Sequence, residues 1–204
     1  MNFTDASLIE RTINGNEQAF AELVRRYQAA VHGTVHRLLG GSSEKEDAVQ
    51  ETFLRAFAAL GKFDPKYPFG PWILRIAVNY CIDQLRKRKT VKLRLWSELR
   101  DSEQERLLRD FTCDNATESS VAPDTEKHAV AARALLDGLN PKYKAAFVLR
   151  EVEEREYIEV AGILGTTEIA ARVRVSRARA ELRKKFNAWL TGRGKKEWVK
   201  NDEL

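Results

Sequence analysis

Hydrophobic residues recur at helical spacing, every three or four positions, along most of the chain. Four long segments show this pattern, and turns rich in glycine, proline or polar residues separate them. They cover residues 5–39, 44–63, 71–89 and 141–186, and a shorter helix is expected over 124–139. We therefore expect an all-α protein in which each helix buries one apolar face.

The first segment begins with a short apolar stripe of Leu8, Ile9 and Ile13, which Gly15 interrupts. A longer stripe then runs from Ala19 to Leu38. His32 and His36 are four residues apart within it and fall on one helical face. A metal would need further ligands, and no partner motif accompanies them, so we interpret them as ordinary histidines and expect no metal site.

The second segment is predicted to be a helix with two different sides, with Ser43 as its cap. The side expected to be buried carries Val49, Phe53, Ala56, Phe57 and Leu60. The other side presents an acidic and amide-bearing strip with one exposed leucine, formed by Asp47, Gln50, Glu51 and Leu54. Such a strip is either a plain solvated face or a docking surface for another protein.

The sequence FDPKYPFGPW at 63–72 contains prolines and Gly70, which exclude a helix, and its aromatic residues are interleaved with Lys62 and Lys66. Exposed rings beside lysines suit single-stranded nucleic acid, because each base that stacks on a ring contributes about 1 to 3 kcal/mol. Packing in the core is the competing interpretation, especially for Phe63 and Trp72.

The third segment has Pro71 in its first turn and is apolar on much of its circumference, so we expect it to be central to its domain. Its end is a cluster of cations: Arg86, Lys87, Arg88 and Lys89. Cations at this position complement the helix dipole, and they also bind phosphates.

The segment 141–186 has the outline of a helix-turn-helix. Its first helix carries an apolar stripe of Tyr157, Val160, the small Ala161 and Leu164. Gly165 can adopt the left-handed conformation that ends this helix. Thr166 or Thr167 can cap the next helix, with Glu168 in its first turn.

The second of these helices has an inner and an outer face. The inner stripe is Ala171, Val175, Ala178 and Leu182. The residues that face outwards are Arg172, Val173, Ser176, Arg177, Arg179 and Arg183. The crossing of the two helices would push this outer face into a major groove, where arginine binds guanine edges in bidentate fashion. A solvated arginine face is the alternative.

Between these helical regions, the polar and acidic sequence from Thr90 to about Lys127 is interpreted as a flexible tether. It includes a possible short helix from Val91 to Phe111, and a helix over 124–139 opens the second domain, with Ala129, Ala132, Leu135 and Leu136 inward. The expected organisation is a first domain at 1–89, a linker at 90–127, a second domain at 128–190 and a tail at 191–204.

The 204 residues are 43% hydrophobic and 32% charged, which predicts a folded protein, and the net charge of +5 favours a polyanionic partner. The two cysteines, Cys81 and Cys113, have no metal-like spacing and suggest no disulfide framework. No signal peptide or membrane-spanning stretch is evident, so we expect a cytoplasmic protein without membrane insertion.

Several motifs together resemble the bacterial sigma factors of the sigma-70 superfamily, specifically the extracytoplasmic-function (ECF) group, which has only regions two and four. They are DAVQETFLRAF at 47–57, WILRIAVNYCIDQLRKR at 72–88, LNPKYKAAFVLREVEEREYIEVAGILG at 139–165 and RARAELRK at 177–184. The resemblance implies a region two helical bundle and a region four helix-turn-helix, in a protein that directs RNA polymerase to promoters.

The resemblance also implies roles for particular residues. The strip of Asp47, Gln50, Glu51 and Leu54 would dock on the clamp helices of the largest subunit of the RNA polymerase core. The melted minus-ten element of promoter DNA would meet Lys62, Lys66, Tyr67, Phe69, Asn79, Arg86 and Arg88, with the loop at 64–70 capturing a flipped base. The minus-thirty-five element would meet Thr167, Arg172, Val173, Ser176, Arg177 and Arg179. An inhibitory anti-sigma factor is a further partner that the resemblance admits.

One part of the recognition helix departs from the family pattern. Where members commonly have glycine, threonine and valine, this chain has Ile169, Ala170 and Ala171, and Val173 replaces a frequent small hydroxyl residue. The start of the recognition helix is therefore less typical of the family.

Two functions of other classes compete with this interpretation. An enzyme would need clustered carboxylates or a nucleophile with a base, and no such constellation occurs, so no catalytic residue and no cofactor is expected. A stand-alone helix-turn-helix transcriptional regulator would normally carry a dimerisation or effector domain. Here the N-terminal half carries the polymerase-docking motif instead.

Overall fold

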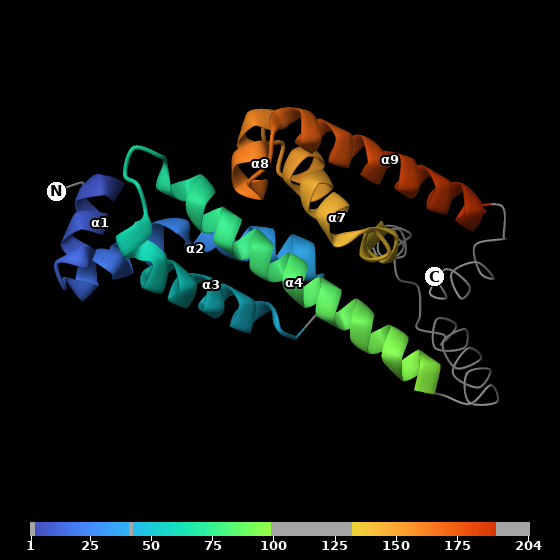
Figure 1. The fold of residues 1–204 in the computed structure, drawn as a ribbon, viewed down its shortest axis with the longest axis horizontal. Helices are drawn as coiled ribbons and strands as arrows, with labels where there is room; N and C mark the ends of the chain where they lie inside the picture. Colours follow the sequence, from blue (N-terminus) through green and yellow to red (C-terminus); the bar gives the residue numbers. More distant parts are fainter. Residues whose placement is uncertain (1–2, 41–42, 99–131, 191–204) are drawn as a thin grey trace, which may run out of the picture.

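The computed structural model describes residues 3–40, 43–98 and 132–190, and every regular element in these ranges is a helix (Figure 1). The N-terminal unit consists of α1 (Asp5–Ile13), α2 (Glu17–Leu39), α3 (Lys45–Ala59), the 3₁₀ turn η1 (Leu60–Lys62) and α4 (Phe69–Glu98). The C-terminal unit consists of a helical turn at 132–137, α7 (Pro141–Phe147), the π-helical segment η3 (Val148–Val152), α8 (Tyr157–Leu164) and α9 (Glu168–Leu190). The prediction of an all-α protein with two helical units is confirmed.

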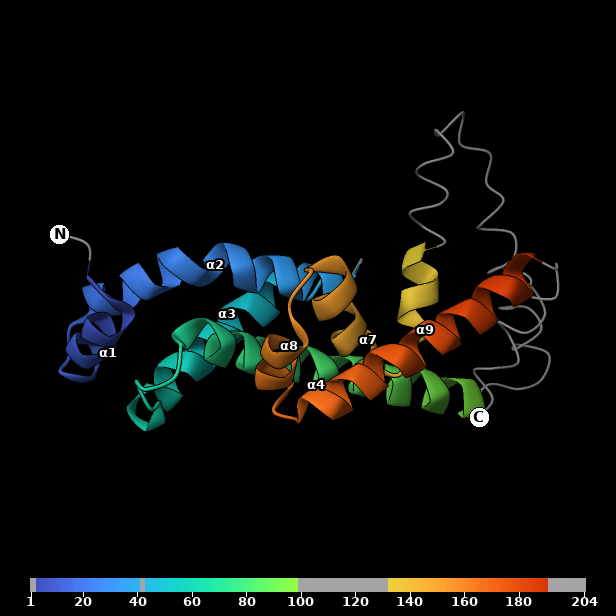
Figure 2. The same ribbon diagram turned by 90° about the horizontal axis from the view of Figure 1, so that it is seen from above.

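In the N-terminal unit, α2 lies beside α1, α3 and α4 (Figures 1 and 2). Its Val31, Val35 and Leu38 are fully buried, and α4 contributes Ile73 and Ala77 to the same core. The i, i+4 and i+7 spacing of the α2 residues puts them on one face, which explains why a long helix can serve as the centre of the bundle.

The starts of α1 and α2 follow local capping chemistry. Thr4 accepts a hydrogen bond from the N–H of Ser7, and Asn16 accepts one of 3.1 Å from Ala19. Gly15, at φ +91°, turns the chain between the two helices. The prediction for Ile13 is wrong: its side chain is 56% exposed, because α1 turns the face with Leu8 and Ile9 towards α2 instead.

Two predictions for α3 are also wrong. The helix begins at Lys45, so Glu44 and not Ser43 occupies the capping position, and no side chain caps it there. Phe57 is 51% exposed, although its ring packs edge-to-face with that of Phe20 at 4.9 Å between centroids. The buried face of α3 carries the small residues Ala48 and Thr52, which allow the helix to lie close to its neighbours.

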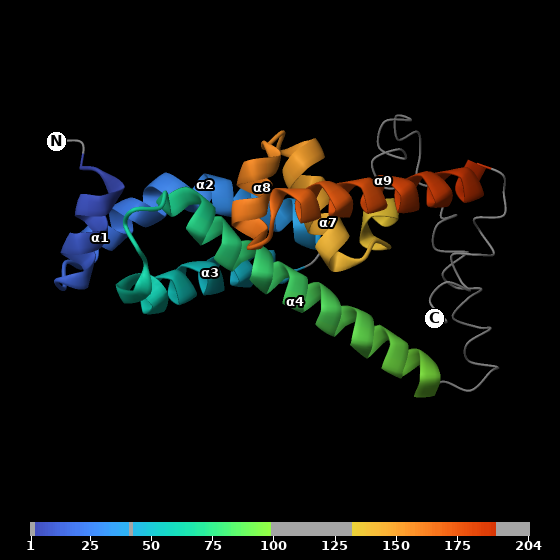
Figure 3. The ribbon, with the colours of Figure 1, turned by 45° about the horizontal axis from the view of Figure 1, so that its top comes forward.

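Helix α4 is longer than predicted at both ends. It begins at Phe69, so the expected non-helical segment ends at Pro68, and Pro71 lies in the first turn as predicted. It continues past the expected end at Lys89 to Glu98, and its last turns extend away from the other helices (Figures 1 and 3). The remainder of the expected linker, 99–127, and the expected tail, 191–204, lie outside the described residues.

In the C-terminal unit, the predicted helix over 124–139 is described only from 132 onwards. Leu135 and Leu136 are half-buried as expected, whereas Ala132 is exposed, and Ala129 lies outside the described residues. Asn140 caps α7 by accepting a hydrogen bond of 3.0 Å from Lys142, and Pro141 occupies the first turn.

The two units pack against each other, which the sequence did not predict. Helices α7 and α8 lie on α4, and η3 meets α2 (Figure 2). The buried residues of the two units form one continuous cluster, in which Ile163 of α8 is fully buried although it lies outside the predicted stripe of that helix. It is buried because α8 has apolar neighbours on two sides.

Candidate nucleic-acid interface

The turn between α8 and α9 has the predicted geometry. Gly165 adopts the left-handed conformation at φ +58°, and its N–H reaches the carbonyl groups of the last turn of α8. Thr167 accepts a hydrogen bond of 3.2 Å from the N–H of Ala170 and so caps α9, with Glu168 in the first turn. A side chain at Gly165 would collide with the guanidinium of Arg75 from α4.

The two faces of α9 are arranged as the helical periodicity predicted. Ala171, Val175 and Ala178 are completely buried, and Leu182 is half-buried. The predicted outer residues, which are Arg172, Val173, Ser176, Arg177, Arg179 and Arg183, are all exposed. The packing against the N-terminal unit therefore leaves this face of α9 open.

Three arginines of this face are held by partners on the C-terminal unit. Arg172 pairs with Glu168 at 2.6 Å and lies over the Tyr157 ring at 4.3 Å. Arg177 donates a hydrogen bond of 3.0 Å to the hydroxyl of Tyr143.

The third arginine, Arg179, pairs with Glu151 at 2.7 Å, and this hydrogen bond raises the pKa of Arg179. Exposed ion pairs contribute only about 0.2 to 1 kcal/mol each, so DNA can replace these partners at little cost. The partners orient the guanidinium groups without blocking them.

On α3, the acidic strip lies on the outer surface. Asp47, Gln50 and Leu54 are exposed, and the exposed fraction of Leu54 is 58%. Glu51 is half-buried because it pairs with Arg55 at 2.7 Å, whose guanidinium in turn covers the Tyr80 ring of α4 at 4.8 Å.

Phe57 extends the strip by one helical turn, and sequence reasoning missed it by assigning it to the core. Its position three residues after the exposed Leu54 is the signal that could have identified it. The strip therefore combines acidic and amide groups with two exposed apolar side chains.

The end of η1 and the loop that follows it present Lys62, Lys66 and Tyr67, and Tyr67 is 68% exposed. Asp64 organises this loop: its carboxylate accepts a hydrogen bond of 3.0 Å from the N–H of Lys66, and its carbonyl accepts one of 3.1 Å from Tyr67. Tyr67 therefore closes an ordered turn, which holds its exposed ring in place.

Phe69 does not belong to this exposed surface, which corrects the prediction that its ring is available to DNA. Only 2% of its surface is exposed, because α4 starts at this residue and directs the ring into the core. The ring lies 5.1 Å from that of Tyr27, 5.7 Å from that of Phe63 and 5.3 Å from that of Trp72. Phe69 therefore supports the loop from beneath.

A concavity of about 160 Å³ opens beside the loop. Its lining includes Phe63, Tyr67 and, from the first two helices, Asp5 and Tyr27. The Tyr27 hydroxyl donates a hydrogen bond to Asp5, and burial, together with this bond, raises the pKa of Tyr27 to about 12. Sequence reasoning missed Asp5 and Tyr27 because nothing in the sequence brings α1 to this loop.

The predicted basic residues of α4 differ in how they are held. Asn79 and Arg86 are exposed, and Arg86 lies 3.4 Å from Asp83. Arg88 is half-buried, and its guanidinium binds Glu44 with a shortest distance of 2.6 Å.

A groove of about 520 Å³ lies between α4 and the start of α7, with the cations Arg86, Lys89 and Lys142 among its lining residues. These cations come from both units, so the groove depends on their packing. A polyanion is the class of ligand that this surface suits.

The comparisons with known proteins agree with this geometry. Residues 23–91 match the family model of sigma-70 region 2, and residues 129–182 match that of sigma-70 region 4. Over 178 residues the chain is 30% identical to the ECF RNA polymerase sigma factor SigW of Bacillus subtilis, which covers 87% of this chain and 94% of that relative.

Two solved structures share the fold. The structure of CnrH in complex with the cytosolic domain of CnrY has a TM-score of 0.59 and 24% identity, and the match covers 90% of this chain and 97% of that one. The sigma factor RpoE of Bartonella quintana, in complex with the anti-sigma factor NepR, has a TM-score of 0.53 and 23% identity, with 81% and 94% covered. The chain therefore belongs to the ECF group of RNA polymerase sigma factors, in the sigma-70 family.

Proposed function

We propose that this sigma factor docks on the RNA polymerase core through the α3 strip and reads promoter DNA with α9 and with the loop before α4. The observation that carries this proposal is that these surfaces lie on different elements and are all exposed at once. A sigma factor acts as a transcription initiation factor, so the chain recognises promoters for an enzyme whose catalytic site lies in another subunit.

The outer face of α9 is the proposed reader of the minus-thirty-five element. Arg172 and Arg177 are oriented by Glu168 and Tyr143, so their guanidinium groups lose little freedom when they bind bases. Val173, at 42% exposure, offers an apolar contact of the kind that thymine methyl groups accept. The remaining members of the proposed surface are Thr167, Ser176 and Arg179.

The proposed contacts to the melted minus-ten element centre on Tyr67. Its exposed ring offers a stacking surface for a base, and the adjoining concavity can receive a base that has left the stack. Lys62, Lys66, Asn79 and Arg86 would hold the backbone of the same strand. Arg88 would have to exchange Glu44 for a phosphate to take part.

The proposed polymerase contact is the strip of Asp47, Gln50, Glu51 and Leu54 on α3, to which we add Phe57. Charged groups around apolar side chains are typical of transient protein interfaces. The clamp helices of the largest polymerase subunit are the proposed partner, as the resemblance to the family implies.

We further propose that the two units separate when the holoenzyme assembles. The minus-ten and minus-thirty-five elements are about 25 base pairs apart, which is roughly 85 Å of B-form DNA at about 3.4 Å per base pair. Helix α4, the longest described element, spans only about 45 Å with 30 residues. The proposed units are 1–89 and 128–190, with 90–127 as the tether and 191–204 as a tail.

The cytoplasm, where RNA polymerase acts, is the proposed location, and none of the described helices is long and apolar enough to cross a bilayer. An anti-sigma factor is a proposed further partner, because a relative of the same fold was solved with one. The stand-alone regulator is not favoured, because the family match includes the N-terminal unit.

The proposal is tested by run-off transcription with purified core polymerase and genomic promoter fragments. We expect start sites that appear only when this chain is added, and we expect the isolated chain to bind the same duplex promoters much more weakly than the holoenzyme does. Tight binding by the isolated chain together with absent initiation would support a stand-alone regulator instead.

A further inference from the structure

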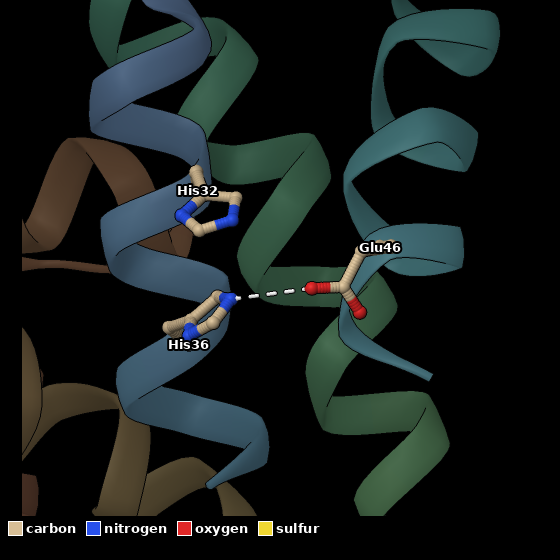
Figure 4. A group of neighbouring side chains, drawn as sticks. All are labelled: His32, His36 and Glu46. Atoms are coloured by element: carbon tan, nitrogen blue, oxygen red, sulfur yellow. Dashed lines mark ion pairs between the residues drawn. The ribbon is translucent and has the colours of Figure 1, made fainter. Parts of the chain in front are cut away.

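A group of three metal-binding side chains lies between α2 and α3, away from the surfaces proposed for DNA. His32 and His36 come from α2, and Glu46 comes from the first turn of α3 (Figure 4). One ligand atom from each of the three residues lies within 4.8 Å of the others. The sequence revealed only the two histidines, because Glu46 reaches them through the packing of the helices.

Glu46 lies across the gap from the two histidines, and His36 points towards its carboxylate, as Figure 4 shows. The imidazole rings of His32 and His36 stack at 4.0 Å between centroids, and Nε2 of His36 lies 3.7 Å from a carboxylate oxygen of Glu46. This nitrogen is buried and has no hydrogen-bond partner, since 3.7 Å exceeds the length of a hydrogen bond. A buried polar atom needs a partner, which an ion or a water molecule can supply.

The distances fit a shared metal ion. Two ligand atoms on a tetrahedral zinc, each about 2.0 to 2.1 Å from the ion, lie about 3.3 Å apart. The gap of 3.7 Å between His36 and Glu46 is close to this value, and the largest separation of 4.8 Å requires a movement of only about 1.5 Å. His32 and Glu46 are exposed, so a movement of this size does not disturb the buried core.

We propose that His32, His36 and Glu46 form a binding site for one divalent transition-metal ion of the zinc class. Two imidazoles and one carboxylate are ligands that such ions accept, with water completing the tetrahedron, whereas magnesium and calcium prefer oxygen ligands alone. Two histidines four residues apart on one helix present their nitrogens on a single face. The bound ion joins α2 to the first turn of α3, where Glu46 directly precedes Asp47 of the acidic strip.

The test is a titration of the metal-free full chain with Co²⁺, followed through the visible absorption of bound cobalt, and then displacement by Zn²⁺. All proteins carry Cys113→Ser, which removes the thiol of the second cysteine as a competing ligand. We expect one ion per chain, and we expect thermal unfolding to occur at a higher temperature with the ion present, because the ion binds the folded state.

The variants are His36→Asn, His32→Asn and Glu46→Gln, each of which should weaken binding by about tenfold or more. His128→Asn is the matched control, because His128 is the third histidine of the chain, and it should bind as the parent does. Circular dichroism verifies that each variant folds. Because His32 and Glu46 are exposed, their substitutions should not unfold the protein, and they test the site even if His36→Asn is unstable. The proposal is overturned if the parent shows no saturable binding below about 1 mM, or if all three variants bind as the parent does.

Discussion

The hydroxyl of Thr34 donates a hydrogen bond of 2.7 Å to the carboxylate of Glu153, across 119 positions of the chain. Thr34 is fully buried in α2, and the Glu153 side chain is only 7% exposed. Arg37 and Arg155 bind the same carboxylate at 3.3 and 2.9 Å. This contact joins the DNA-reading C-terminal unit to the central helix of the N-terminal unit.

Replacement of Thr34 by valine keeps the shape of the side chain but removes the hydrogen bond to Glu153. Because the acceptor is charged, we expect a loss of about 1.5 to 3 kcal/mol in the free energy of unfolding. Urea denaturation measures this loss, and Thr90→Val, at an exposed position, is the control with an expected change within about 0.5 kcal/mol. Identical midpoints for Thr34→Val and the parent would mean that the two units are not held by this contact in solution.

The substitution Glu51→Lys should abolish assembly with core polymerase while the fold stays intact. It reverses a charge in the acidic strip on the surface of α3 and removes the partner of Arg55. Co-elution with core polymerase on size exclusion measures assembly, and Glu10→Lys, on the exposed surface of α1, is the matched charge reversal that should co-elute normally. If Glu51→Lys also co-elutes normally, the docking surface is assigned to the wrong helix.

Tyr67 and Phe69 should respond in opposite ways to substitution by alanine. Phe69→Ala removes a buried ring and should destabilise the fold by about 3 to 5 kcal/mol. Tyr67→Ala should leave stability unchanged and weaken the binding of the melted strand by about 1 to 3 kcal/mol. Thermal unfolding and open-complex formation by the holoenzyme separate the two effects; a Tyr67→Ala holoenzyme that melts promoters normally would contradict the stacking role.

Replacement of Arg172 by alanine should cost about 1 to 3 kcal/mol at one base pair of the upstream element and relax specificity there. Holoenzyme binding to promoters with each base varied at that position measures this effect. Lys184→Ala, an exposed change further along α9, should alter affinity equally for all sequences or not at all. An equal loss on every promoter for Arg172→Ala would indicate a phosphate contact.

Acid should destabilise the protein partly through Glu22. Hydrogen bonds from Arg25 and Arg26 lower the pKa of this carboxyl group from 4.5 to about 2. The unfolded state therefore binds the proton first, so this stabilisation is fully present above about pH 4.5 and is lost as the pH falls towards 2. Unfolding temperatures between pH 5 and 2 should fall less steeply in Glu22→Gln; an unchanged slope would show that the two arginines do not hold this carboxylate.

Helical periodicity predicted much of the site because neighbours on one helix lie at fixed intervals. The outer face of α9 and its cap at Thr167 follow from residues within one or two turns of each other. The left-handed turn at Gly165 is equally local, since only the absence of a side chain allows it easily.

The same reasoning was wrong where a residue's surroundings come from another element. Phe57 was predicted to be buried and Phe69 to be available to DNA. In the structure Phe57 is exposed and Phe69 is buried. The difference depends on where α4 begins and on how closely α3 approaches α2. Periodicity contains no information about either.

The sequence by itself determined that the chain forms helices, where most of them lie, and which family it belongs to, because these properties depend on residues that are close together along the chain. The tertiary structure alone decided which distant groups meet: Thr34 with Glu153, Asp5 with the loop at Tyr67, and Glu46 with the two histidines. Such meetings depend on the angles at which helices cross and on the burial shared between them. These are properties of the packed molecule and not of any one segment.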